Sequence, residues 1–220
     1  MNIEEQNKRY EFLDLSLDSG VLMLVVNKPR SLNALDTKLL EELDDCLSSL
    51  RQQKDSVLKG MIFTGSCEKD FIAGADIKEM SAMGTLEAEK FAVAGQKVTL
   101  LLEDLPFPVI AAVNGFALGG GCEMAMSADF IFATKNAVFG QPEVRLGLIP
   151  GFGGTQRLAK IVGRNKAKEI IYSGRNVSVE EAHELGLVLR IYDKKSEMIK
   201  GASELLDQIA QNSPLAVSRA

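Results

Sequence analysis

The chain has 220 residues, of which 46% are hydrophobic and 25% charged, and its formal net charge is −5. This size and composition predict one globular domain, residues 1–220, that buries a full core. The acidic balance argues against a general nucleic-acid-binding or anionic-membrane surface, because such surfaces need clustered lysine and arginine. No apolar stretch reaches the roughly 18 residues of a bilayer-spanning helix, so we expect neither nucleic acid nor a membrane as partner.

The N-terminal segment Met1–Glu11 shows no sorting signal. It mixes three glutamates with two basic residues and has neither the apolar stretch of a signal peptide nor the Arg/Ser-rich bias of a transit peptide. We therefore expect a cytoplasmic protein.

Cysteine and histidine are too few and too scattered for a metal site. The three cysteines have no paired spacing, and the only histidine, His183, is far from all of them in sequence, so no zinc site is expected. Cys122 could act as a nucleophile only if His183 folded back beside it. The alternative, which we favour, is a small buried helix residue.

The first half of the chain alternates strands and helices. Val21–Asn27 is a short apolar, β-branched run between glycine and proline, which predicts a buried strand. A helix follows, with Asp36 as N-cap and leucines at helical spacing up to Arg51. Gly60–Thr64 predicts a second buried strand. The run Phe71–Met80 reads as a loop leading into a short helix.

A long helix is expected next, capped by Thr85 and stopped by the prolines at 106 and 108. Val109–Val113 predicts the third core strand, and the glycine run after it opens a helix at about Gly121. The remaining expected elements, in chain order, are strands at Asp129–Thr134 and Ala137–Phe139, helices at Thr155–Val162 and Asn165–Tyr172, a helix that opens with the capping box Ser178-x-x-Glu181, and a helix start after Pro214.

Two glutamates set twenty residues apart each end a glycine-containing segment. Glu123 follows Gly119–Gly121, and Glu143 follows Gly140–Pro142. Glycines that open a helix leave backbone N–H groups and the positive end of the helix dipole exposed, where charge can develop on an oxygen. The two carboxylates can then move protons beside a carbonyl. Taken singly, each glutamate has a plainer interpretation, as an anion at a helix N-terminus or as a solvated turn residue.

Other glycine-loop functions do not fit. The run Gly115–Gly121 lacks the Gly-Lys-Ser/Thr ending of a P-loop, and no GxGxxG with a downstream acidic residue follows the first strand. The methionines near these motifs are typical of core packing, although Met80 and Met83 are also candidates for the wall of a deformable acyl pocket.

Four segments together resemble the crotonase family, and most closely its enoyl-CoA hydratases. They are Ser31–Leu35 (SLNAL), Phe71–Met80 (FIAGADIKEM), Ala112–Met126 (AVNGFALGGGCEMAM) and Phe139–Leu158 (FGQPEVRLGLIPGFGGTQRL). The resemblance implies an α/β fold wound as a spiral of ββα units. It also implies a homotrimer or a dimer of trimers, with C-terminal helices over the acyl pocket. Those helices are expected to be incomplete, because the sequence ends at Ala220.

The resemblance also assigns roles in adding water to a 2-enoyl-CoA thioester. The backbone N–H groups of Ala75 and Gly120 form an oxyanion hole for the thioester oxygen. Glu123 holds and deprotonates the water, and Glu143 exchanges the proton at C2. Because two carboxylates share one water, at least one should have a raised pKa. No cofactor and no metal are expected, since coenzyme A is part of the substrate.

Further residues match the family's coenzyme A and acyl contacts: Arg30, Ser31 and Ala34 toward the nucleotide end, Ala73, Asp76, Ile77 and Lys78 beside the adenine and pantetheine, and Gly151 near the acyl group. Arg30 stands where a lysine is common, which leaves its phosphate geometry open. A solvated salt bridge is an equal alternative for Asp76 and for Lys78. A plain turn is an equal alternative for Gly151.

Several functions stay open at this point. A hydratase of fatty-acid or related acyl-CoA degradation fits best, because an isomerase or another enolate-stabilising member would commonly keep one acid–base residue. A non-catalytic or RNA-binding protein of the same fold would need a basic helix face, whereas the helix Asp36–Arg51 carries four acidic residues between 41 and 45. A fragment of a larger β-oxidation protein with a fused dehydrogenase is a further alternative.

Overall fold

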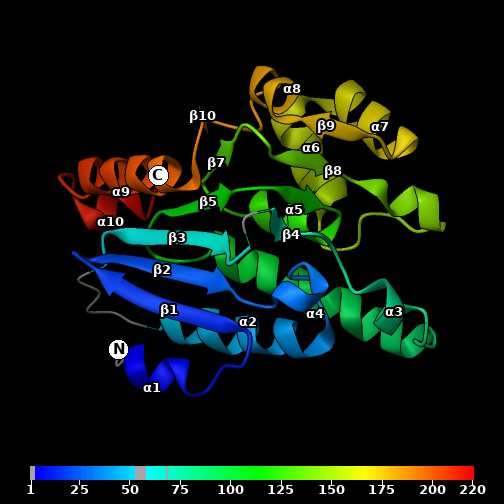
Figure 1. Cartoon of the computed structure of the whole chain (residues 1–220), viewed down its shortest axis with the longest axis horizontal. Coiled ribbons are helices and arrows are strands. Elements are labelled where there is room, and N and C mark those ends of the chain that lie inside the picture. Colours follow the sequence, from blue (N-terminus) through cyan, green and yellow to red (C-terminus); the bar gives the residue numbers. More distant parts are fainter. Residues whose placement is uncertain (1–2, 53–57, 68) are drawn as a thin grey trace.

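The computed structural model describes residues 3–52, 58–67 and 69–220 (Figure 1). Met1 and Asn2, part of the segment inspected for a sorting signal, lie outside them. The strands form two sheets. The larger sheet has the order β1 (Leu13–Asp18), β2 (Val21–Val26), β3 (Gly60–Gly65), β5 (Val109–Val113), β7 (Phe130–Thr134) and β10 (Arg190–Tyr192). The smaller has the order β4 (Asp70–Ile72), β6 (Phe116–Leu118), β8 (Val138–Gly140) and β9 (Asn176–Ser178).

The helices fill the connections between these strands. In chain order they are α1 (Ile3–Asn7), the 3-10 helix η1 (Pro29–Ser31), α2 (Thr37–Arg51), α3 (Ile77–Met80), α4 (Thr85–Glu103), α5 (Gly120–Ala125), the 3-10 helix η2 (Pro142–Leu146), α6 (Gly154–Val162), α7 (Arg164–Ser173), α8 (Val179–Glu184), α9 (Lys195–Ile209) and α10 (Pro214–Val217).

Successive units of two strands and a helix wind the chain into a spiral. In the pairs β3–β4, β5–β6 and β7–β8, the first strand joins the large sheet and the second joins the small sheet. After β4 and β6, helices lead the chain back to the large sheet, whereas after β8 they lead to β9 of the small sheet, and α8 then leads to β10 of the large sheet. Neighbouring turns of the spiral pair in parallel in both sheets. The expected α/β spiral of ββα units is thereby confirmed.

The central strands of the large sheet are buried on both faces, which explains their unbroken apolar sequences. In β3, Met61 and Phe63 face the main hydrophobic cluster, which α2 and α4 complete, whereas Ile62 faces a second cluster made with α9. Figure 1 shows α9 on one side of the sheet and α2 on the other. Because successive side chains of a strand point to opposite faces of the sheet, β3 contributes residues to both hydrophobic clusters.

Most sequence-predicted elements are present, with ends shifted by a few residues. Asp36 caps α2, because its carboxylate accepts from the Leu39 N–H at 2.9 Å. The prediction that Thr85 caps α4 is wrong. Gly84 is the N-cap, and its N–H donates to the Glu87 carboxylate at 2.8 Å.

Only half of the predicted capping box at α8 forms. The Ser178 hydroxyl accepts from the Glu181 N–H at 3.3 Å, but the Glu181 carboxylate binds Arg175 at 2.6 Å instead of the Ser178 N–H. A charge-assisted contact to a guanidinium is stronger than a contact to one neutral N–H, so the Glu181 carboxylate binds Arg175 and the second bond of the capping box does not form. The helix start after Pro214 is confirmed as α10.

Within the described ranges, no helix combines the length and the apolar character needed to cross a bilayer.

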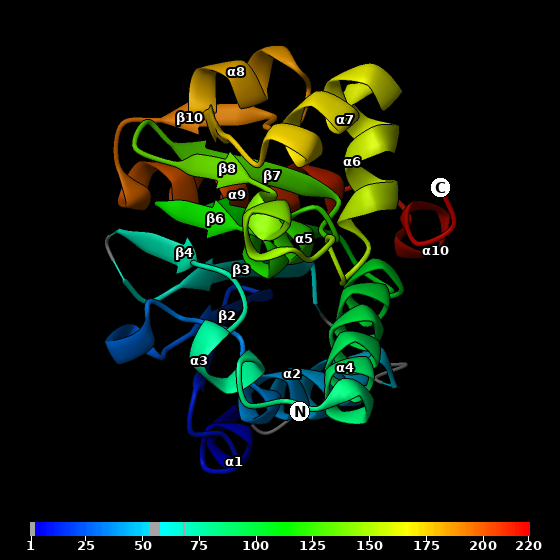
Figure 2. The same ribbon diagram turned by 90° about the vertical axis from the view of Figure 1, so that its right-hand side faces the viewer.

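The small sheet brings distant motifs to one edge. β4, β6 and β8 are parallel neighbours, paired at Ile72 with Ala117 and at Ala117 with Phe139, and they lie side by side in Figure 2. Their carboxyl ends therefore meet. Ala73–Ala75 follows β4, Gly119–Glu123 follows β6, and Gln141–Glu143 follows β8.

We predict that Gly121→Ala destabilises the fold by at least about 2 kcal/mol, although alanine favours helix more than glycine. A Cβ on Gly121 would stand 1.9 Å from the backbone oxygen of Ile72, and a backbone atom cannot move aside as a flexible side chain can. Gly84→Ala is the matched control, because its nearest atom would be 3.6 Å away. Urea unfolding midpoints measure both, and equal midpoints for the two variants would contradict the prediction.

Candidate active site

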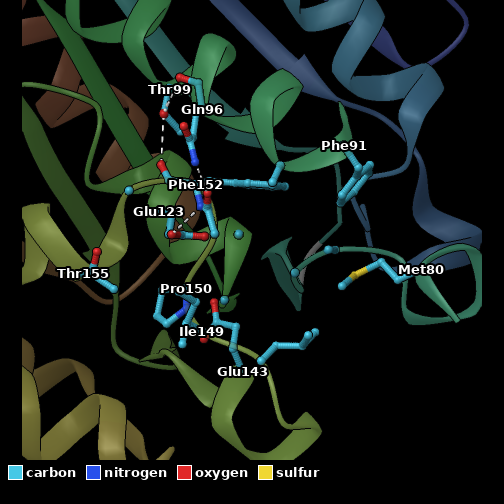
Figure 3. A pocket seen from close by; sticks show the side chains of 18 of the residues that line it. Met80, Phe91, Gln96, Thr99, Glu123, Glu143, Ile149, Pro150, Phe152 and Thr155 are labelled. Carbon is cyan, nitrogen blue, oxygen red and sulfur yellow. Dashed lines mark hydrogen bonds between the residues drawn. The ribbon is translucent and has the colours of Figure 1, made fainter. Parts of the chain in front are cut away.

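A cavity of about 1130 Å³ opens at the carboxyl ends of β4, β6 and β8. The segments after these three strands form one wall, α4 forms another, and the stretch 146–153 closes the third side. Figure 3 shows Glu123 and Glu143 on this lining, with Phe91 and Met80 across from them. Met83 also lines the cavity, whereas Met124 and Met126 are buried in the core.

The Ala75 N–H faces the cavity because of how its neighbours bond. Leu35 forms an isolated parallel bridge with Ala75, in which the Leu35 N–H donates to Gly74 O and Leu35 O accepts from the Asp76 N–H, both at 2.8 Å. A parallel bridge uses the residues on either side of Ala75 and turns the N–H of Ala75 away from Leu35. Ala75 lines the cavity, and its N–H has no acceptor among the described residues.

The second N–H at this point belongs to Gly120, the first residue of α5. Gly119 before it has φ +50°, a conformation that favours glycine and that turns the chain from β6 into the helix. Gly119 O, on the same peptide unit as the Gly120 N–H, accepts from Gln141 Nε2 at 3.1 Å and from the Glu123 N–H at 3.0 Å. These two bonds fix the peptide plane. In the described part of the chain, the Gly120 N–H has no acceptor.

Glu123 is 1% exposed and fixed by two backbone donors. Its Oε1 accepts from the Phe152 N–H at 2.8 Å and from the Gly154 N–H at 2.6 Å. Burial raises the pKa of this carboxyl, and the two N–H donors counteract the rise because they favour the charged form. Glu123 is thus a desolvated carboxylate that is held in place without a cationic contact at hydrogen-bond distance.

Glu143, unlike Glu123, has a carboxylate that accepts no hydrogen bond from the described residues. It stands on η2, and both of its carboxylate oxygens are buried. Burial, followed by the charge of Glu123, raises the pKa of Glu143 to about 7. A buried carboxyl without a donor favours the protonated form, so Glu143 is suited to give a proton near neutral pH.

Three side chains fix the loop that supplies the two donors to Glu123. Gln96 Nε2 donates to Gly151 O at 2.8 Å, and the Thr99 hydroxyl donates to Phe152 O at 3.0 Å. Arg157 donates to the same Phe152 O at 2.8 Å while it makes two contacts of 2.8 Å with Glu103. The loop is therefore tied to α4 and α6, and it holds Glu123 at a set position.

The sequence-predicted coenzyme A residues divide into two groups. Ala73, Ile77 and Gly151 line the cavity. The others lie outside its lining: Arg30, Ser31, Ala34, Asp76 and Lys78. The two segments that carry them are adjacent, since the Ala73 N–H donates to Leu32 O at 3.2 Å and Leu35 bonds on both sides of Ala75.

The Asp76 carboxylate caps α3 by accepting from the Lys78 and Glu79 N–H groups at 3.0 and 3.1 Å, and this cap takes the place of the salt bridge considered from the sequence. Sequence reasoning missed Asn33, which is fully buried and holds the turn before Leu35 by contacts with Lys28 N and Phe71 O. It also assigned no role to Gln141, which lies within the motif that ends at Glu143 and donates to Gly119 O.

The Cys–His alternative finds no support in the geometry. Cys122 is buried in α5, where burial raises the pKa of its thiol to about 12. His183 Nδ1 is instead paired with Val188 O at 2.8 Å. Among the described residues, no three histidine, cysteine or acidic side chains are grouped so that they could hold a metal ion.

Comparison with known proteins identifies the family. The model of the enoyl-CoA hydratase/isomerase family matches residues 16–220. The chain belongs to this family. It is 48% identical over 203 residues to a short-chain-enoyl-CoA hydratase of Clostridium acetobutylicum. The aligned residues are 92% of this chain and 77% of that relative.

A crotonyl-CoA hydratase of Syntrophomonas wolfei is 43% identical over 208 residues, which are 94% of the chain and 79% of that relative. Among solved structures, an enoyl-CoA hydratase from Bacillus anthracis superposes with a TM-score of 0.89 at 38% identity. The match covers 94% of this chain and 80% of the other. The spiral fold and the segments around both glutamates thus lie in a region shared with hydratases.

The raised pKa of Glu143 predicts a pH-dependent stability cost. The pKa rises from 4.5 to about 7 on folding, so between these values the folded state binds more protons and stability falls as pH rises. Glu143→Gln should therefore raise the free energy of unfolding by roughly 1–3 kcal/mol at pH 8 and change it little at pH 4.5. Urea unfolding at the two pH values measures this, with Glu41→Gln, on the exposed face of α2, as control. The same pH dependence in Glu143→Gln and wild type would contradict the raised pKa.

Proposed function

We propose that the protein is an enoyl-CoA hydratase that adds water reversibly, in syn fashion, across the double bond of a 2-enoyl-CoA thioester. The observation that carries the proposal is the position of two buried carboxylates with different environments beside two unbonded backbone N–H groups. The names of the two relatives support a short acyl chain. The reaction belongs to fatty-acid or related acyl-CoA degradation.

In the proposed reaction, the thioester oxygen accepts from the N–H groups of Ala75 and Gly120. Water attacks C3, and negative charge develops on this oxygen as the enolate forms. Removal of one such donor typically costs about 3–4 kcal/mol of transition-state stabilisation. The Gly119–Gly120 peptide is fixed by two donors to Gly119 O, so its N–H needs little reorganisation as the charge grows.

The two glutamates divide the proton transfers. Glu123, which two N–H donors keep available as an anion, takes a proton from water as its oxygen bonds to C3. Glu143, with a pKa raised to about 7, gives its proton to C2. Water is thereby added as hydroxyl at C3 and hydrogen at C2, and a proton passed from Glu123 to Glu143 restores the starting state. The reverse sequence dehydrates the product.

Coenzyme A is proposed to lie along the adjacent segments 30–35 and 73–78. The thioester end reaches the cavity past Ala73, Ala75 and Ile77, while Arg30, Ser31, Ala34, Asp76 and Lys78 border the nucleotide end at the surface. Gly151 borders the acyl group. No separate cofactor or metal enters this reaction, because coenzyme A arrives as part of the substrate.

The alternatives are less well supported. An isomerase needs one acid–base residue, whereas Glu123 and Glu143 both line this cavity next to the unbonded N–H groups. An RNA-binding role needs a basic helix face, and the acidic side chains of α2 instead bind the N-terminal segment and α4. Asp45 contacts Arg9 and Tyr10, and Asp44 contacts Lys97. Assembly as a homotrimer or dimer of trimers and a cytoplasmic location remain predictions from the family resemblance and the sequence.

We predict that Glu123→Gln and Glu143→Gln each lower kcat for crotonyl-CoA hydration at least about 100-fold with little change in substrate affinity. Glutamine keeps the shape of each side chain and removes proton transfer. Loss of the ultraviolet absorbance of the enoyl thioester measures the rate. Glu41→Gln is the matched control and should keep wild-type activity. Near-normal hydration by either site variant would remove that residue from the mechanism.

A further inference from the structure

One aromatic ring occupies part of the cavity beside the two catalytic glutamates. Phe152 is only 4% exposed although the loop that carries it lines the cavity. Its ring packs against Phe91 of α4, with centroids 5.6 Å apart and planes tilted by 54°. In Figure 3 the two rings project toward one another across the space next to Glu123. The ring is therefore an inner wall of the cavity.

Space for this ring is made by Gly95, in the middle of α4. A Cβ on Gly95 would lie 2.2 Å from Cε1 and 2.3 Å from Cδ1 of Phe152. Gly95 is not among the glycines with positive φ, so the backbone conformation there does not require glycine. Glycine is also among the least favourable residues in a helix interior. The absence of a side chain at residue 95 thus serves to admit the Phe152 ring.

Phe152 is fixed next to Gly120 and Glu123, the residues proposed to bind the thioester oxygen and the water. A Cβ on Gly120, whose N–H is the proposed oxyanion donor, would lie 3.0 Å from Phe152 Cε2. The Phe152 N–H binds Glu123, and Phe152 O accepts from Thr99 and Arg157. Because both polar groups of its backbone are bonded, the residue cannot swing away without breaking contacts that position Glu123.

We propose that Phe152, seated against Gly95, sets the length of acyl chain that the enzyme accepts. The ring lines the cavity next to Gly120, whose N–H is proposed to bind the thioester oxygen. Under the proposal, a four-carbon enoyl group fits beside the ring, and each further methylene meets it. The proposal rests on the proposed hydratase function and adds the residue pair that determines specificity. A packed interior tolerates added methylenes poorly, and each can change a specificity ratio by about tenfold or more.

The test compares kcat/KM for trans-2-enoyl-CoA esters of four, six, eight and ten carbons. Phe152→Ala should raise the ratio of the eight-carbon to the four-carbon value at least about 10-fold over wild type. Gly95→Ala should push the ring into the cavity and lower the six- to ten-carbon values more than the four-carbon value.

A side-chain exchange sharpens the test. In Gly95→Leu/Phe152→Ala, the new leucine grows from α4 into the volume that the ring leaves, so the four-carbon preference of the wild type should return. Phe132→Leu is the control for lost packing, since Phe132 is fully buried in the second cluster, under α9. That control should leave the chain-length ratio unchanged.

The outcomes separate the two proposals. If the wild type hydrates none of these esters, the proposed function fails. If it hydrates them and Phe152→Ala lowers all chain lengths equally, Phe152 only packs the loop and the specificity proposal is overturned. If Phe152→Ala does not fold, Gly95→Ala decides alone: an unchanged chain-length profile in that variant overturns the proposal.

Discussion

The parallel pairing of β4, β6 and β8 is the constraint on which the site depends. Each strand has three residues, and the segment that follows each strand lines a different part of the cavity. Because hydrogen bonding fixes their register, the N–H of Ala75, the N–H of Gly120 and the carboxyl of Glu143 arrive at one edge, with no hydrogen bond among them in the described part of the chain. Small residues at close approaches, such as Gly121 against Ile72, let α5 lie directly on this sheet.

Both glutamate carboxyls of the site are buried, which disfavours their charged forms, and the surrounding hydrogen bonds offset only part of this cost. Glu123 receives two backbone donors, while Glu143 receives none among the described residues. The two donors favour the ionised form of Glu123, whereas burial without a donor favours the protonated form of Glu143, and an acid–base pair uses such a difference. The loop from Gly151 to Gly154 supplies the donors, and Thr99, Gln96 and Arg157 keep it in place.

Much of this was predictable from the sequence because the strong signals are local. The apolar runs at β3 and β5, the Asp36 cap and the two glutamate motifs depend on neighbouring residues, and all were found. Most missed strands have weak local signals: β4, β6, β9 and β10 have three residues each, and β1 alternates as an edge strand. The helix α9 was also missed, although its buried residues Met198, Ala202 and Leu206 recur at helical spacing. The clamp on Glu123 joins residues 29 to 31 positions apart, and Gly95 is explained only by Phe152. Such pairings arise from the tertiary fold, so no sequence window contains them.

The double contact of Glu123 Oε1 links chemistry to the mechanics of the loop. Both bonds are charge-assisted while the carboxyl is ionised, and a neutral acceptor binds about half as strongly. If Glu123 takes the water proton as proposed, its two contacts with the N–H groups of residues 152 and 154 weaken together. Under the proposed mechanism, proton uptake by Glu123 therefore loosens one wall of the cavity as the product forms, and passing the proton on to Glu143 tightens it for the next substrate. In the proposed mechanism, the Glu123 carboxyl therefore both accepts the water proton and holds the loop through its charge.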